Sequence, residues 1–220
     1  MKYSNSVTNR KEKTRRMTLF AMLLTLELLL ILTPLGFIPL GPISATTLHI
    51  PVILCGILMG PVYGGVLGLV FGLSSLIKNT ITPLITSFVF SPFISIGGIQ
   101  GNIWSVWIAI GPRILLGVIA AYLFSVFSKR LKHKTLAVGI TAGISTFLHT
   151  LMVMGSIYLF FGPQYAQANN ITPQALLSVI AGVIFVNGIG EIIVSIIIAI
   201  AVYKVTWKLI DHRKVEKTRS

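Results

Sequence analysis

Long apolar runs separated by short polar segments dominate this sequence and limit what it can fold into. A helix that crosses a lipid bilayer needs about 20 predominantly apolar residues. The chain is 54% hydrophobic and only 10% charged, whereas about a quarter of the residues in an ordinary soluble domain are charged. These proportions exclude a cytosolic globular enzyme and a disordered chain. They predict an all-α, polytopic membrane protein.

The apolar runs give approximate positions for six spanning helices. They cover residues 17–34, 48–59, 61–77, 103–127, 136–161 and 176–207. The second run is short, and Gly60-Pro61 leaves almost no loop before the third, so these two runs are expected to form a tight hairpin. The sequence thus predicts one membrane domain over 17–207, flanked by basic cytoplasmic tails at 1–16 and 208–220.

The basic residues provide an independent test of the number of spans. Sixteen of the 18 Lys and Arg residues lie near the two ends of the chain or in the stretch 129–134. Short cytoplasmic loops are enriched in Lys and Arg, and six spans place all three groups on one side, with both termini in the cytoplasm. Because the basic residues do not spread over one face, the net charge of +13 does not indicate a nucleic-acid binder.

The N-terminal region has two other interpretations. A basic tail followed by an apolar run resembles a secretory signal peptide, and Arg15-Arg16 resembles a twin-arginine signal. The run is long for a signal peptide, and no small-x-small cleavage site follows it. We therefore interpret the basic tail as a topology signal.

Polar and charged side chains inside the apolar runs are candidates for function, and the charged ones are the most costly to bury. They cost about 2.5–3.5 kcal/mol at the bilayer centre on insertion scales, so they normally face the bundle interior. Arg113, His149 and Asn187 reach similar depths, given a helical rise of about 1.5 Å per residue. Glu191 lies one turn beyond Asn187 on the same face, and Glu27 lies in the first run.

Two interpretations of Arg113 remain open at this stage. In the first, Arg113 binds an anionic group of a ligand, helped by His149 and Asn187. In the second, Arg113 pairs with Glu191 and only ties two helices together. For His149 the alternative is a neutral contact between helices.

Small residues recur every fourth position in several runs. Such rows occur at 64, 68 and 72, at 56 and 60, and at 139 and 143. Rows of this type let helix backbones pack closely in lipid, so we interpret them as internal packing surfaces. The first run carries Ala21 and Thr25 four residues apart, and this pair is a candidate contact surface for a helix of a partner protein.

Three segments are expected on the outer side, at 35–47, 78–102 and 162–175. The middle segment is uncharged after Lys78 and rather apolar, so we expect it to fold onto the bundle as a lid. The third is expected to be a plain connector. The sequence contains no Walker A, H-E-x-x-H or G-x-S-x-G motif and only one cysteine, so we expect no enzyme activity, no metal site and no cofactor.

The order of motifs resembles a known transporter family. Residues 34–53 read PLGFIPLGPISATTLHIPVI, the Gly60-Pro61 hairpin follows, and the glycine row of the third run comes next. This order is similar to that of substrate-binding (S) components of energy-coupling factor (ECF) vitamin transporters. The stretches 44–49, 86–93 and Gly111-Pro112-Arg113 look most like the pantothenate-specific S component.

The resemblance implies an ABC-type complex in the plasma membrane of a prokaryote. In such a complex the S component captures a vitamin outside and topples to release it inside, together with a transmembrane T subunit and two cytosolic ATPases. The first helix of the family usually carries an Ala-x-x-x-Ala row that meets the T subunit. Here the matching positions are Ala21 and Thr25, so the second alanine is replaced.

Pantothenate has one carboxylate, two hydroxyls and an amide, so its site needs a cation, neutral hydrogen-bonding groups and apolar walls. Arg113 would supply the cation. The expected polar contacts are Asn187, His149, Thr46, Thr47 and Asn79, and the expected walls are Phe88, Phe90 and Trp104.

Three alternatives remain for the function. The first is an S component for another vitamin, such as folate or riboflavin. The second is a stand-alone ion-coupled secondary transporter with Glu27 or Glu191 as its proton site. The third is a membrane scaffold that binds no small molecule.

Overall fold

The structure is a computed structural model that describes residues 2–39, 44–172 and 174–219. Over these ranges it is all-helical apart from short hairpins. Its six α-helices are α1 (Lys2–Leu32), α2 (His49–Met59), α3 (Pro61–Ile81), α4 (Ile103–Arg130), α5 (Lys134–Ala168) and α6 (Leu176–Arg219). Four of the described helices, α3 to α6, are long and apolar enough to cross a membrane, and α2 is a shorter apolar helix. Each helix overlaps one predicted apolar run, and α1, α5 and α6 extend beyond theirs.

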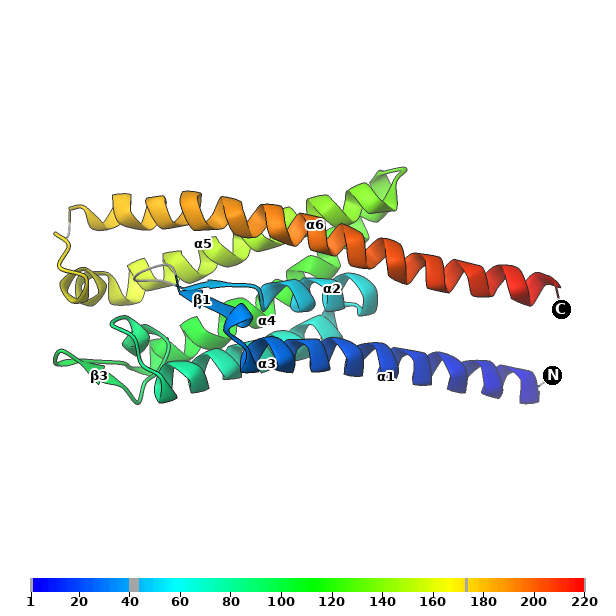
Figure 1. Cartoon of the computed structure of the whole chain (residues 1–220), viewed down its shortest axis with the longest axis horizontal. Helices are drawn as coiled ribbons and strands as arrows, with labels where there is room; N and C mark the ends of the chain where they lie inside the picture. The colour runs from blue at the N-terminus through cyan, green and yellow to red at the C-terminus, as the bar shows by residue number, and fades with distance from the viewer. Residues whose placement is uncertain (1, 40–43, 173, 220) are drawn as a thin grey trace.

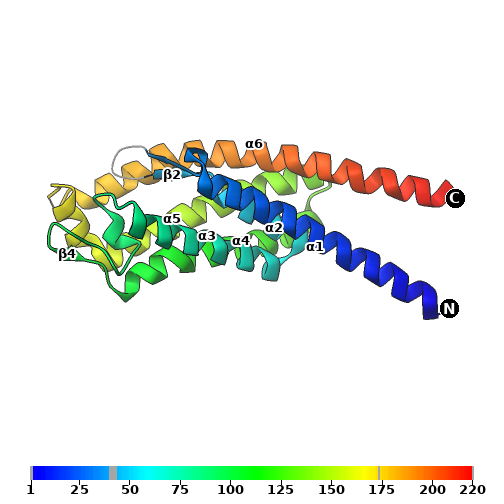
Figure 2. The ribbon, with the colours of Figure 1, turned by 60° about the horizontal axis from the view of Figure 1, so that its bottom comes forward.

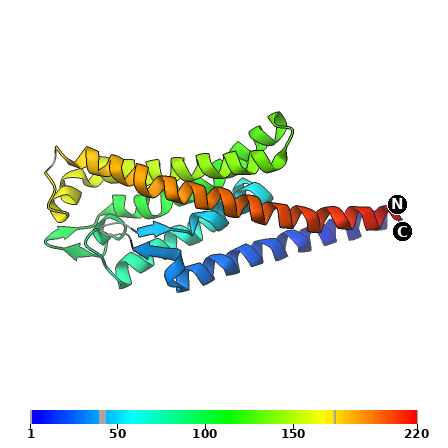
Figure 3. The same cartoon turned by 45° about the horizontal axis from the view of Figure 1, so that its top comes forward.

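The helices run back and forth along one long axis, so the two termini lie at the same end of the molecule (Figure 1). The connections after α3 and α5 lie at the opposite end, and the connection after α1 lies between that end and the middle of the molecule. At the terminal end α1 and α6 extend well beyond the other helices (Figure 2), and the two ends of the chain lie at this same end in a third view (Figure 3). The shared end of the two termini is the arrangement expected from the distribution of Lys and Arg, whereas the number of membrane crossings stays a prediction.

Short hairpins and 3-10 turns fill two of these connections. Strand β1 (Phe37–Pro39) pairs antiparallel with β2 (Ser44–Thr46), after the turn η1 (Pro34–Gly36). The turn η2 (Ser87–Val89) precedes β3 (Ser95–Ile96) and β4 (Ile99–Gln100), which pair antiparallel. Gly97 and Gly98 make the β3–β4 turn with φ of 60° and 81°, a conformation that residues with a Cβ rarely adopt. Residues 40–43 and 173 of the predicted outer segments lie outside the described residues.

The segment 78–102 folds onto the bundle, as expected from its apolar sequence. Phe88 is fully buried, and its ring lies 5.8 Å from that of Phe161 on α5. Ser105 in the first turn of α4 donates a hydrogen bond to the carbonyl of Phe88 at 2.7 Å. These contacts fix η2 against α4 and α5.

The prediction that 162–175 is a plain connector was wrong for its first half. Helix α5 continues through Pro163 to Ala168. Proline removes one helical hydrogen bond, but Phe161 and Tyr165, on either side of it, are both almost fully buried. Their packing against neighbouring elements holds the helix together where the local sequence predicts its end.

Helices α3 and α4 approach each other at backbone distance because of the glycine row. A Cβ built on Gly64 would lie 2.7 Å from the carbonyl oxygen of Gly117, and one on Gly72 would lie 2.8 Å from Cα of Ile110. A Cβ on Gly68 would lie 2.7 Å from the carbonyl carbon of Arg113. Backbone cannot move aside as a side chain can, so the row confirms the predicted packing surface. It also fixes the position of Arg113.

Helix α2 lies at the centre of the core. Every residue from His49 to Ile57 is buried, and the cluster around it draws apolar side chains from α1, α3, α4, α5 and α6. A second apolar cluster forms near the loop end, around Phe88, Phe161 and Tyr165. The candidate site lies where these two clusters meet.

Replacement of Gly68 by Ala is expected to destabilise the protein by roughly 1–3 kcal/mol, because the new methyl group overlaps the backbone of α4. Thermal unfolding of the purified protein measures this loss. Gly182→Ala is the matched control, since a Cβ there meets no atom within 4 Å and alanine favours a helix. Equal unfolding midpoints for Gly68→Ala and Gly182→Ala would contradict the proposed packing.

Candidate functional site

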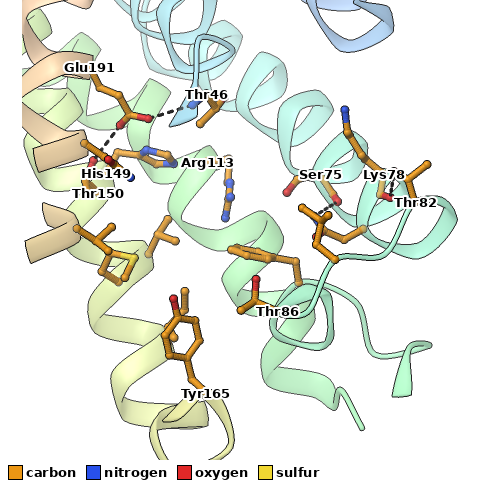
Figure 4. Close-up of a pocket in the computed structure, with 18 residues that line it drawn as sticks. Thr46, Ser75, Lys78, Thr82, Thr86, Arg113, His149, Thr150, Tyr165 and Glu191 are labelled. Carbon is orange, nitrogen blue, oxygen red and sulfur yellow. Dashed lines mark hydrogen bonds between the residues drawn. The ribbon is translucent and has the colours of Figure 1, made fainter. Parts of the chain in front are cut away.

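A cavity opens in the loop-side half of the bundle. The empty space between its lining atoms amounts to about 970 Å³, which includes the open space at its mouth. Its polar lining comprises Thr46, Ser75, Lys78, Asn79, Thr82, Thr86, Arg113, His149, Thr150, Tyr165, Asn187 and Glu191. The apolar lining comprises Leu84, Phe90, Val153, Met154, Ile157 and Val183. Figure 4 shows these side chains converging from several elements.

The fold brings together six of the nine residues predicted to bind a ligand. The residues at the cavity are Arg113 on α4, Asn187 on α6, His149 on α5, Thr46 on β2, Asn79 on α3 and Phe90 after η2. They come from positions up to 141 residues apart, yet they line one space. The similar depths expected for the three residues on α4, α5 and α6 thus correspond to a shared site.

The other three predicted residues do not line the cavity. Thr47 donates its hydroxyl to the carbonyl of Leu35 at 2.8 Å. Phe88 is enclosed in the apolar cluster against α5. Trp104 is 46% exposed and stacks on Phe160, with ring centroids 4.1 Å apart. Because its position in the first turn of α4 directs it along the outside of the bundle, Trp104 cannot form a wall of this cavity.

Arg113 occupies the cavity because of the proline that precedes it. Pro112 lacks the N–H that would bond to the carbonyl of Ile108 one turn earlier, and the Nη1 group of Arg113 donates to that carbonyl instead. The guanidinium carbon also lies 5.4 Å from the ring centre of Phe71 and 5.3 Å from that of Phe90, within the range of cation–π attraction. In the motif Gly111-Pro112-Arg113, the proline thus leaves free the carbonyl that binds the guanidinium of the next residue.

The ion pair between Arg113 and Glu191 is not formed in the structure, although both residues lie in the part of the chain that it describes. Glu191 instead accepts a hydrogen bond from the backbone N–H of Thr46 at 3.0 Å and one from the hydroxyl of Thr150 at 3.4 Å. Arg113 as a residue is only 5% exposed, and its Nε has no hydrogen-bond partner. This geometry favours the ligand-binding interpretation of Arg113.

Two further cavity side chains carry buried polar atoms without partners. These are Nε2 of His149 and the hydroxyl of Tyr165. The ring of His149 packs nearly parallel to that of His49, at 6.4 Å and 14°, and lies 6.0 Å from the ring of Phe71. Buried polar atoms are rarely left unpaired in proteins, so these atoms and Nε of Arg113 indicate where a ligand would bind.

Asn79 holds the segment that closes one side of the cavity. Its amide donates to the carbonyl of Ser75 at 2.8 Å and accepts from the hydroxyl of Ser87 at 2.8 Å. Ser87 in turn accepts from the N–H of Leu84 at 2.8 Å. These bonds tie the end of α3 to η2 and place Phe90 beside the guanidinium.

Sequence reasoning missed several lining residues, including Ser75, Thr82, Thr150 and Tyr165. Serine and threonine in an apolar helix commonly bond to their own backbone, so their type alone does not mark a site. Tyr165 lay in the segment predicted to be a connector. Within the described ranges, no three His, Cys, Asp or Glu side chains gather as a metal would require.

The candidate partner surface lies on the outer face of α1. Ala21 and Thr25 are both exposed there, and the hydroxyl of Thr25 donates to the carbonyl of Ala21 at 2.8 Å. The threonine therefore satisfies its own polar group within the helix. Large apolar side chains at Met22, Leu26 and Leu29 are exposed on the same helix.

The comparisons with known proteins agree on one family. The profile described as "ECF transporter, substrate-specific component" matches residues 15–203. The pantothenic acid transporter PanT of Lactococcus lactis subsp. cremoris is 31% identical to this chain over 162 residues. The alignment covers 73% of this chain and 76% of that relative.

The cavity predicts a difference in thiol labelling between two positions on α6. Asn187→Cys is expected to react with a water-soluble thiol reagent because residue 187 lines the cavity. Ser195→Cys is the matched control, because Ser195 is fully buried two turns further along the same helix. The native Cys55 is buried and is expected to stay unlabelled. Mass spectrometry of the labelled protein measures each reaction, and equal labelling at 187 and 195 would contradict the assigned cavity.

Proposed function

Because the chain belongs to the family of ECF transporter substrate-specific components, we propose that it captures pantothenate from outside the cell. As a member of that family it is a substrate-binding membrane subunit of a transporter and not an enzyme. The observation that carries the choice of substrate is the buried Arg113, which lines the cavity and forms no salt bridge with a carboxylate of the described residues. The similarity of most of the chain to a pantothenic acid transporter supports the same choice of substrate.

The chemistry of the cavity matches the groups of pantothenate. Arg113 would bind the carboxylate, since a guanidinium and a carboxylate form paired, charge-assisted hydrogen bonds. Nε2 of His149, the amide of Asn187 and the hydroxyl of Thr46 would bind hydroxyl and amide groups. The aromatic face of Phe90 would cover the apolar part of the ligand.

The remaining predicted residues are assigned to supporting roles. Asn79 and Thr47 would hold the loops that border the cavity, as their hydrogen bonds to neighbouring segments suggest. Phe88 would anchor η2 against α5, and Trp104 would pack on the outside of the bundle. The 78–102 segment would act as a lid over the bound vitamin.

We propose that all six helices cross the plasma membrane and that both termini are cytoplasmic. The termini lie at the end of the molecule opposite to the β3–β4 hairpin and the connection between α5 and α6 (Figure 1). The basic stretch between α4 and α5 lies at the same end as the termini, so one orientation places all the basic groups inside. In this orientation the membrane domain covers 17–207, the tails 1–16 and 208–220 enter the cytoplasm, and the cavity faces outward.

The family implies a vitamin substrate and an energising module as partners. We propose that this module consists of a transmembrane T subunit and two cytosolic ATPases, and that α1 docks on the T subunit. The exposed apolar face of α1 around Ala21 and Thr25 supports this docking surface. The small side chains would let the partner helix approach closely.

Replacement of Arg113 by Ala is expected to weaken pantothenate binding by about 2–5 kcal/mol, because the variant loses the cation that faces the carboxylate. Isothermal titration of the purified chain with pantothenate measures the change. Arg130→Ala is the matched control, since Arg130 is exposed in the last turn of α4, away from the cavity. If a folded Arg113→Ala variant binds pantothenate as tightly as the unaltered chain, Arg113 does not bind the ligand and its role is structural.

A stand-alone ion-coupled transporter is the second candidate, favoured by one observation. Glu27 on α1 is fully buried, and neither of its carboxylate oxygens has a hydrogen-bond partner. A buried carboxylate without a partner is a possible proton site.

Uptake measurements separate the two candidates. Vesicles that hold this chain with the T subunit and the ATPases are expected to accumulate labelled pantothenate in the presence of ATP, because the chain itself lacks a nucleotide-binding motif. Vesicles that hold the chain alone, with a proton gradient imposed, are expected to accumulate none. Accumulation driven by the gradient alone, and lost in Glu27→Gln, would support the secondary transporter.

A further inference from the structure

We propose that Glu191 is a specificity-determining residue that accepts hydrogen bonds from hydroxyl groups of the ligand. The cavity would thereby select hydroxylated monocarboxylates over acids that lack donor groups and over dicarboxylates. This inference rests on the proposed function, because it assigns a role to a second residue of the same cavity. Two observations support the inference, namely the hydrogen bonds of Glu191 and the absence of a salt bridge between Glu191 and Arg113.

Glu191 is a carboxylate that the protein orients but does not saturate. Its Oε1 accepts from the backbone N–H of Thr46, and its Oε2 accepts from the hydroxyl of Thr150. A carboxylate has about four acceptor positions, so acceptor capacity remains on a side chain that lines the cavity. The contact to Thr150 is long at 3.4 Å, which leaves Oε2 the more weakly bound of the two oxygens.

The cation and the anion of the cavity are held apart by separate partners. Arg113 is bonded to the carbonyl of Ile108 and lies close to two aromatic rings. Glu191 is bonded to β2 and α5, and Figure 4 shows its dashed contacts to Thr46 and Thr150 with Arg113 apart from them. Both side chains line one cavity and form no salt bridge with each other.

A ligand that satisfies both residues needs an anionic group and a set of donors on the same molecule. The carboxylate would lie against Arg113 and the hydroxyls against Glu191. A second carboxylate at the Glu191 side would meet a like charge in a partly buried site, where repulsion is strong. An acid without donors would leave the buried acceptors of Glu191 unsatisfied on binding.

A cycle that changes both the protein and the ligand tests this assignment. The ligands are pantothenate and the same N-acyl-β-alanine without its two hydroxyls, and the proteins are the unaltered chain and Glu191→Gln. Glu191→Gln retains the shape and the acceptor for Thr46, but it removes the charge. Glu12→Gln, on the exposed N-terminal part of α1, is the matched control. Titration calorimetry gives the affinity for each combination.

In the unaltered chain, loss of the hydroxyls is expected to weaken binding about 10- to 100-fold, as for hydrogen bonds to a charged group. In Glu191→Gln the same change in the ligand is expected to cost at least about 5-fold less, with Glu12→Gln behaving like the unaltered chain.

Three outcomes would overturn the assignment. If both ligands bind the unaltered chain equally well, the hydroxyls have no acceptor, whatever the variant does. If Glu191→Gln weakens both ligands to the same extent, Glu191 only positions β2. If the unaltered chain binds pantothenate but the Glu191→Gln variant binds both ligands unchanged, the acceptor lies elsewhere. Absence of pantothenate binding to the unaltered chain would instead overturn the proposed function itself.

Discussion

The contact on which the site depends is the one between the guanidinium of Arg113 and the carbonyl of Ile108. In a membrane, a backbone group that loses its helical partner has no water to replace it. Pro112 frees that carbonyl inside α4, and the side chain of the next residue returns to satisfy it. The missing helical hydrogen bond and the side chain that replaces it thus lie within about one turn of α4. As a result, the buried guanidinium of Arg113 points into the cavity.

The surrounding packing keeps that cation in place. The glycine row of α3 brings the two helices together at the backbone of Arg113, and Phe71 on α3 contributes one of the two aromatic faces. The second face comes from Phe90, which reaches the cavity because hydrogen bonds from Ser105 and Ser87 pin η2 to α4 and α3. The close packing of α3 on α4 and the anchoring of η2 therefore both fix the position of the Arg113 side chain.

The site combines opposite charges without neutralising them. A direct pair between Arg113 and Glu191 would fill the hydrogen-bonding capacity of both groups and leave the cavity with little chemistry for a ligand. The hydroxyl of Thr150 and the N–H of Thr46 hold the carboxylate, while the aromatic rings hold the guanidinium. Thr150, which sequence reasoning missed, and Thr46, which it expected to contact a ligand, therefore decide whether the charged residues act as a site or only tie two helices together.

The sequence by itself determined the apolar helices and the glycine row as a packing surface, because apolar length and four-residue spacing are local properties of the chain. It also indicated Arg113, His149 and Asn187 as a group, because depth along a helix follows from residue number. Only the tertiary structure decided that α5 continues through Pro163, that Trp104 faces outward, and that Glu191 bonds to Thr46 instead of Arg113. Each of these depends on a side-chain direction or on a partner distant in sequence, and neither is encoded in spacing along one helix.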